Sequence, residues 1–232
     1  MPDSSTLLLY GSCRADARPA VEEALCSRAG VQDAPLALVE DVALLAITSS
    51  VDRSCLRAPG TDTVLAYRDV IEAAYAAAPV VPFRFGTPAA SAEEATALVA
   101  RHRTSLRTHL TRFEGHVEMG VRLELTETTS APASSPGEAA SGRAYLEARR
   151  DARVRATATF DAVVDAYRTA VGEACVDTTG DRHDDAPVVS LAFLVPEARA
   201  AAVGDRLASA SPDGVAAAHV VGPWAPYSFV DL

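Results

Sequence analysis

Apolar and polar positions in the first third of the chain switch between the two-residue spacing of strands and the wider spacing of helices. Strands are predicted at residues 6–13, 36–40, 42–50 and 80–85, and helices at 18–28 and 62–78. The resulting order is β-α-β-β-α-β. This order is typical of a ferredoxin-like sandwich, in which one antiparallel sheet carries two helices on one face.

A long helix is predicted after this first set. Ser91 and Glu94 have the spacing of a capping box, which places the start of the helix at Ser91. Gly115 marks its end, and four arginines lie in its later turns, where the helix dipole favours positive charge. We expect residues 89–115 to form a connecting helix.

The same order of elements is predicted a second time in the remainder of the chain. Strands are expected at 116–125, 175–178, 188–195 and 215–221, and helices at 142–172 and 196–210. The predicted fold class is therefore α+β, with two ferredoxin-like β-α-β-β-α-β domains joined by a helix. The expected boundaries are 1–88 for the N-terminal domain, 89–115 for the connecting helix and 116–232 for the C-terminal domain.

Residues 126–142 interrupt the second set. They are rich in Ser, Thr, Ala, Pro and Gly, and such a segment buries too little apolar surface to order itself. We interpret it as a flexible surface loop inside the C-terminal domain.

Charge and length exclude several classes of protein. The chain has 232 residues and a formal net charge of −10, which argues against nucleic acid or an anionic membrane surface as the main partner. No window approaches the roughly 20 apolar residues of a membrane-spanning helix, and no signal peptide is evident. These features favour a cytoplasmic protein.

The sequence contains no recognisable catalytic or cofactor-binding motif. Phosphate-cradling and dinucleotide-binding glycine patterns and the nucleophile-elbow pattern are all absent. The four cysteines are isolated in the sequence, and we expect reduced, mostly buried thiols. Cys13 has no base beside it in the sequence. We therefore predict neither catalytic residues, nor a cofactor, nor an enzyme.

Three histidines recur every seven residues, at His102, His109 and His116. The first two are about 10 Å apart on a helix, too far for one metal ion, and a solvated helix surface is the favoured interpretation. His116 and Glu118 could share a strand face but lack a third ligand. The acidic run at 181–185 lacks the ligand spacing of a calcium loop and is expected to be a solvated turn. No metal site is predicted.

One charged residue lies in an apolar strand. Arg84 stands between Phe83 and Phe85, and alternation would place its side chain opposite to both rings. A charge in such a strand needs a partner or a solvated face. Both alternatives stay open: a solvated sheet face, or an ion pair with Glu114 or Glu118.

The last eleven residues, 222–232, contain three of the chain's 13 aromatic residues, namely Trp224, Tyr227 and Phe229. Pro223 and Pro226 stiffen this segment and are expected to prevent a regular central strand. A stiff aromatic segment must dock, either on its own domain or against a partner. If the Trp224 indole lies in the domain core, its replacement by alanine should cost about 3–5 kcal/mol.

Several of these segments, in this order, resemble the GvpL/GvpF family of gas vesicle proteins. The resemblance spans nearly the whole chain, and the terminal GPW-x-PYSF pattern is its most specific part. The compact length favours the GvpF type. The matching segments are LLLYGSC near the start, VVPFRFGT at 80–87, LTRFEGHVEMGVRL at 110–123, SGRAYLEARR at 141–150, AFLV at 192–195 and GPWAPYSFV at 222–230.

The resemblance implies a minor component of the gas vesicle, located at the vesicle in the cytoplasm. It implies that the protein binds the small hydrophobic wall protein (GvpA type) and other minor gas vesicle proteins, and that it assists nucleation and assembly by limiting aggregation. The alternative is a ferredoxin-like regulatory protein that binds a small molecule; this rests on fold analogy alone. The candidate partner-binding or structural residues are Arg84, Phe85, Glu118, Pro223, Trp224, Pro226, Tyr227 and Phe229.

Overall fold

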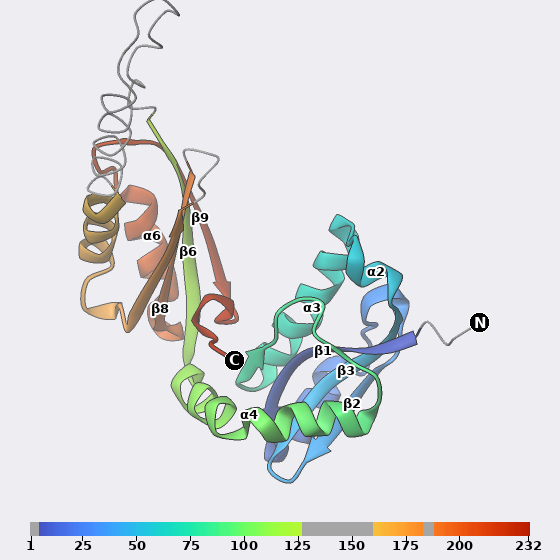
Figure 1. Cartoon of the computed structure of the whole chain (residues 1–232). Coiled ribbons are helices and arrows are strands. Elements are labelled where there is room, and N and C mark those ends of the chain that lie inside the picture. The colour runs from blue at the N-terminus through green and yellow to red at the C-terminus, as the bar shows by residue number, and fades with distance from the viewer. Residues whose placement is uncertain (1–4, 127–159, 183–187) are drawn as a thin grey trace, which may run out of the picture. The chain divides into compact units, whose positions relative to one another are not determined.

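The computed structural model describes residues 5–126, 160–182 and 188–232 (Figure 1). These residues form two compact units. The first unit extends to Glu118 and also includes Trp224–Leu232, and the second extends from Met119 to Pro223. Each unit combines helices with an antiparallel sheet, so the predicted α+β class with two domains is confirmed.

The sheet of the first unit is built around β1. Its strand order is β2-β3-β1-β4, with β5 also paired to β1, and the pairings of β1 are all antiparallel. Strand β3 lies between β1 and β2 and therefore splits the first β-α-β unit. The strands are β1 (Ser5–Arg14), β2 (Leu36–Asp41), β3 (Leu44–Asp52), β4 (Val80–Pro82) and β5 (Pro88–Ala89).

Both faces of this sheet are covered by helices (Figure 1). Leu8, Tyr10 and Cys13 of β1 are buried in one core cluster with residues of α1 and α3. Helix α4 contacts β1, β2, β3 and β4 and covers the other face. The helices are α1 (Arg18–Leu25), α2 (Ser54–Arg57), α3 (Thr61–Ala77) and α4 (Ala92–Phe113), and short 3-10 turns lie at Ala15–Ala17 and Val31–Asp33.

Helix α4 differs from the predicted connecting helix 89–115. Its start is confirmed, because the Ser91 side chain accepts the Glu94 N–H and the Glu94 carboxylate accepts the Ala90 N–H. However, α4 buries Val99, Leu106, Leu110 and Phe113 and belongs wholly to the first unit. His109 lies on this buried face, 8% exposed, so its predicted solvation is wrong.

The sheet of the second unit has the strand order β7-β8-β6-β9. The helix predicted at 142–172 falls within the described ranges from residue 160 onward, where residues 160–171 are helical. The ferredoxin-like detail of both units stays a prediction. The elements that follow α4 include β6 (His116–Leu125), β7 (Asp177–Arg182), β8 (Val188–Pro196), α6 (Ala200–Ser209) and β9 (Val215–Trp224), with 3-10 turns at Gly172–Ala174, Glu197–Arg199 and Tyr227–Phe229.

Some predicted segments differ from the structure or lie outside it. The strand predicted at 80–85 ends at Pro82, and β9 continues through Pro223 to Trp224. A proline is compatible with β9 because this strand is at the edge of its sheet. The expected loop 126–142 lies outside the described residues beyond Thr126, as does most of the acidic run at 181–185.

The predicted domain boundaries differ from the observed units in two places. Residues 89–115, expected as a connector, are part of the first unit, and so is the tail Trp224–Leu232, which was assigned to the C-terminal domain 116–232. Position in the sequence does not predict the unit to which the tail belongs, because the tail binds residues that are 110 and 153 positions away in the chain.

The structure also bears on the cysteines, on metal binding and on membrane spans. All four cysteines are free thiols, but only Cys13 is buried. Within the ranges that the structure describes, no three His, Cys, Asp or Glu residues form a group that could hold a metal ion. Among the same residues, no helix is long and apolar enough to cross a membrane.

The core of the first unit contains a buried hydroxyl network. The Tyr10 hydroxyl accepts the Val31 N–H at 2.8 Å and lies 2.8 Å from the Ser49 hydroxyl. Tyr10 also stacks on Tyr67, with ring centroids 4.9 Å apart. The network connects β1, β3 and the turn after α1.

Replacing Tyr10 by phenylalanine should lower the free energy of unfolding by about 1–3 kcal/mol, because the buried Val31 N–H loses its partner. Urea unfolding of the full chain measures this loss. Tyr167→Phe is the matched control, since its hydroxyl makes only a 3.4 Å contact with Ala210, and it should cost less than about 1 kcal/mol. Equal losses in the two variants would contradict the prediction.

A candidate partner-binding groove beside the C-terminal tail

A large hollow of the first unit lies along the tail, residues 224–232, and we call it the tail groove. Its volume is about 1080 Å³. Its walls come from α3, the segment after β4, α4 and the tail, so segments that are far apart in the sequence build it. The lining residues are Val64, Tyr67, Arg68, Pro82, Phe83, Arg84, Phe85, Thr87, Leu98, His102, Glu118, Trp224, Tyr227, Ser228, Val230, Asp231 and Leu232.

Glu118 is the first anchor of the tail. Its carboxylate accepts the Ser228 N–H at 2.8 Å and the Ser228 hydroxyl at 2.8 Å, while the residue is only 6% exposed. These two hydrogen bonds replace part of the hydrogen bonding with water that the carboxylate loses when it is buried. Burial nevertheless raises the pKa of Glu118; the bonds from Ser228 lower it, and the charge of Glu72 raises it further.

Glu72 of α3 is the second anchor. Its carboxylate oxygens accept the Ala225 N–H at 3.2 and 3.3 Å. Burial raises the pKa of Glu72 above its usual range. Burial and the neighbouring Glu72 carboxylate likewise raise the pKa of Tyr227, so its hydroxyl remains protonated.

Apolar contacts hold the tail between these two anchors. Ala225 is fully buried and joins the core cluster of the first unit, and Phe229 is 5% exposed. The Arg112 guanidinium lies 5.7 Å from the centre of the Phe229 ring, a cation–π distance. Pro226 is buried as well, whereas Trp224 is half-buried and faces the groove. Trp224 is therefore not the core residue of the tail.

Arg84 lies in a turn rather than in a strand. The chain leaves β4 at Pro82, and the Arg84 carbonyl accepts the Thr87 N–H at 3.1 Å and the Thr87 hydroxyl at 2.7 Å. Gly86 has φ +82, which glycine tolerates and most residues do not. The alternation expected of Phe83, Arg84 and Phe85 is lost, and all three line the groove.

Neither ion pair expected for Arg84 forms. Glu114 pairs with Arg14 at 3.1 Å, and Glu118 binds Ser228. Among the described residues, the exposed Arg84 guanidinium has no hydrogen bond or ion pair. A positive charge is thus available at an otherwise largely apolar groove.

The floor of the groove is aromatic. The Tyr67 hydroxyl lies within 3.2 Å of three backbone carbonyls, those of Leu9, Tyr10 and Phe83, which fixes the ring where β1 meets the Phe83 segment. The Phe85 ring packs edge-on against Tyr67 at 5.0 Å. Five of the chain's 13 aromatic residues line this one hollow.

The structure brings together most of the residues singled out in the sequence. Arg84, Phe85, Glu118, Trp224 and Tyr227 line the groove, and Pro226 and Phe229 are buried behind it. Pro223 is exposed and belongs to the second unit. The sequence analysis did not find Val64, Tyr67 or Glu72, and it considered His102 only as a metal ligand or a solvated helix residue. The scarcity of aromatic residues could have indicated Tyr67.

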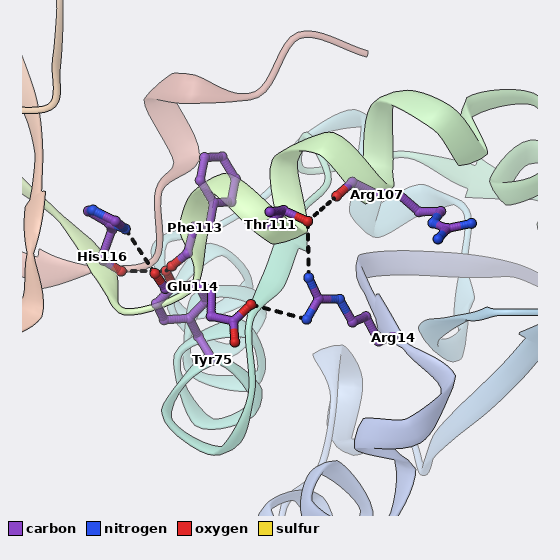
Figure 2. A network of polar contacts seen from close by, with 7 residues as sticks. All are labelled: Arg14, Tyr75, Arg107, Thr111, Phe113, Glu114 and His116. Atoms are coloured by element: carbon purple, nitrogen blue, oxygen red, sulfur yellow. Dashed lines mark hydrogen bonds and ion pairs between the residues drawn. The ribbon is translucent and has the colours of Figure 1, made fainter.

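Polar contacts fix the end of α4, as Figure 2 shows. The Tyr75 hydroxyl lies 2.9 Å from the Phe113 carbonyl and 2.5 Å from the His116 carbonyl. The His116 ring nitrogen Nδ1 lies 2.9 Å from the Glu114 carbonyl. These contacts join α3 to the turn between α4 and β6 and so position Glu118 two residues further on.

Two other candidate chemistries lose support from their surroundings. Burial raises the pKa of the Cys13 thiol to about 12, and a protonated thiol is a poor nucleophile. The Glu118 carboxylate of the His116/Glu118 pair is already occupied by Ser228.

Phe229→Ala should lower the free energy of unfolding by about 3–5 kcal/mol, because the buried ring leaves a cavity. Trp224→Ala should cost clearly less, because its indole is half-buried at the groove. Urea unfolding of both full-length variants tests the difference. The prediction fails if Trp224→Ala is the more destabilising of the two.

The raised pKa values of Glu118 and Glu72 predict a pH dependence of stability. From the ordinary glutamate pKa of 4.5 upward, the folded state binds more protons than the unfolded state, so the free energy of unfolding falls as the pH rises. We expect this slope to be shallower in Glu118→Gln, whose amide can still accept from Ser228. Urea unfolding across that pH range measures it, and an unchanged slope would contradict the assignment.

Comparison with known proteins identifies one family. The family model described as "Gas vesicle synthesis protein GvpL/GvpF" matches residues 6–231. Gas vesicle protein L2 of Halobacterium salinarum is 31% identical over 179 residues, which cover 64% of this chain and 63% of that protein. The match thus spans somewhat under two thirds of that relative.

Two solved structures are similar in fold. GvpF from Microcystis aeruginosa has a TM-score of 0.72 at 14% identity, covering 98% of this chain and 99% of that chain. GvpF from Anabaena sp. PCC7120 has a TM-score of 0.70 at 14% identity, covering 99% and 97%. At this identity the two structures support the fold, and the family model supports the relationship. The chain belongs to the GvpL/GvpF family of gas vesicle synthesis proteins.

Proposed function

We propose that this protein is a minor component of the gas vesicle that binds the small hydrophobic wall protein in the tail groove and limits its aggregation during nucleation and assembly. The observation that carries the proposal is the groove itself. An open hollow of about 1080 Å³ with aromatic walls is a suitable site for an apolar segment of a partner.

Burial of a partner segment would act against aggregation by mass action. A segment held in the groove is withdrawn from contact with other copies of the wall protein. The concentration of free segment that can aggregate therefore falls as the bound fraction rises. The net charge of −10 keeps the carrier itself soluble. These roles place the protein at the gas vesicle in the cytoplasm, where other minor gas vesicle proteins are further candidate partners.

Exposed apolar side chains at the rim support an apolar occupant. Val64 of α3 is 44% exposed and Leu232 is 46% exposed, and both line the groove. Two arginines line the groove, and Arg68 is paired with Asp69. Arg84 therefore adds the positive charge that selects a segment with a carboxylate or a carbonyl oxygen opposite it. No catalytic step is part of this role.

Val64→Asp should abolish the protection of the wall protein, because it places a carboxylate in the apolar wall of the groove. Val176→Asp is the matched control: Val176 is 52% exposed but does not line the groove. Each full-length variant is co-expressed with the wall protein, followed by pull-down and sedimentation. We expect wild type and Val176→Asp to retain the wall protein in the soluble fraction and Val64→Asp to lose it.

Two outcomes would refute the proposal. The first is equal recovery of soluble wall protein with both variants. The second is a thermal-shift response to a small metabolite that Val64→Asp removes while wall-protein binding persists, because it would favour the alternative of a small-molecule-binding regulatory protein. A groove of this volume is large enough for such a ligand.

A further inference from the structure

A second surface of the first unit has a different chemistry from the groove. The outward face of α4 lines two hollows, of about 510 and 570 Å³, which share Arg107 and Thr111. We call this surface the Arg107 face. Its charged and hydroxyl-bearing members, all in the first unit, are Arg14, Asp16, Thr104, Arg107, Thr108, Thr111 and Arg112.

Arginines outnumber carboxylates in the lining of the Arg107 face, three to one, although the protein as a whole has a net charge of −10. The sequence between residues 95 and 113 has four arginines and no carboxylate, and of these Arg103 is paired with Asp41 outside this surface. In addition, Arg14 at the end of β1 reaches the same surface. Such a local reversal of sign attracts a negatively charged partner to one place on the molecule.

The hydroxyl-bearing residues between the arginines are unusual for an exposed helix. Thr104, Thr108 and Thr111 are all exposed and follow the three- and four-residue spacing of one helix face. Threonine is β-branched and has a lower helix propensity than Lys, Glu or Ala, which an exposed helix face also accommodates. Their short side chains leave the hollow of about 570 Å³ between Arg107 and Arg112.

The surface already holds two carboxylates of the chain itself, Asp16 in its lining and Glu114 beside it. Figure 2 shows the Arg14 guanidinium between Glu114 and Thr111: it donates to the Glu114 carboxylate at 3.1 Å and to the Thr111 hydroxyl at 3.1 Å. Within residues 5–126, 160–182 and 188–232, the exposed Arg107 guanidinium has no hydrogen bond or ion pair. Arg107 can therefore accept a carboxylate from another molecule with both edges of its planar fork.

We propose that the Arg107 face binds an acidic segment of a partner protein, whose carboxylates pair with Arg107 and whose backbone lies over the threonines. A long polyanion such as a nucleic acid fits less well, because the remainder of the acidic chain repels it. This binding is independent of the tail groove: α4 lines the groove with Leu98 and His102 and the Arg107 face with other residues.

The test uses the full chain and a short fluorescent peptide in which glutamate alternates with alanine, with anisotropy measured at low ionic strength. The matching peptide with glutamine in place of glutamate should not bind. Arg107→Glu should weaken binding of the glutamate peptide by at least about tenfold, which corresponds to about 1.4 kcal/mol. Arg107→Lys should give a smaller loss, because lysine keeps the charge but not the bidentate fork.

Arg101→Glu is the matched control, because Arg101 is exposed on α4 but lines neither hollow. It changes the net charge equally and should alter binding less than about twofold. Equal weakening by Arg101→Glu and Arg107→Glu would overturn the proposal, because binding would then depend on the overall electrostatic field of the protein and not on a specific contact with Arg107. Preferential, Arg107-dependent binding of a single-stranded oligonucleotide over the glutamate peptide would also overturn it.

Discussion

Docking of the C-terminal tail onto the first unit is the interaction on which the groove depends. Glu118 and Glu72 receive the backbone N–H groups of Ser228 and Ala225, and Phe229 is buried between them and α4. Without the tail, the groove would lose the wall that carries Trp224 and Tyr227. The two partners of the Glu118 bond are 110 residues apart in sequence, yet closing a long loop costs only slightly more than closing a short one.

Burial of a carboxylate costs desolvation free energy unless hydrogen-bond donors replace the lost water, and this requirement makes the docking of the tail specific. Each carboxylate needs donors at defined positions, and Ser228 supplies two such donors to Glu118. A tail shifted by one residue would leave Glu118 buried without them. The carboxylates therefore favour one register of the tail, and the apolar contacts of Ala225 and Phe229 supply the attraction.

Helix α4 connects the two surfaces of the first unit. Its buried residues cover the sheet, Leu98 and His102 line the tail groove, and Arg107 and the threonines form the Arg107 face. The hydrogen bonds of Tyr75 and Arg14 fix its C-terminal end to α3 and β1. One helix thus contributes to an apolar hollow and to an arginine-rich surface of the same unit.

The sequence by itself determined the α+β class, the order of the elements, the start of α4 at Ser91 and the family, because these depend on local periodicity, capping and short motifs. The concentration of aromatic residues in the tail also indicated a docking segment. Only the tertiary structure decided where it docks, why neither Glu114 nor Glu118 pairs with Arg84, and why Phe229 is buried while Trp224 is only half-buried. The reason is that these features rest on contacts such as Glu118 with Ser228 and Glu72 with Ala225, whose partners are distant in the chain and leave no periodic trace in the sequence.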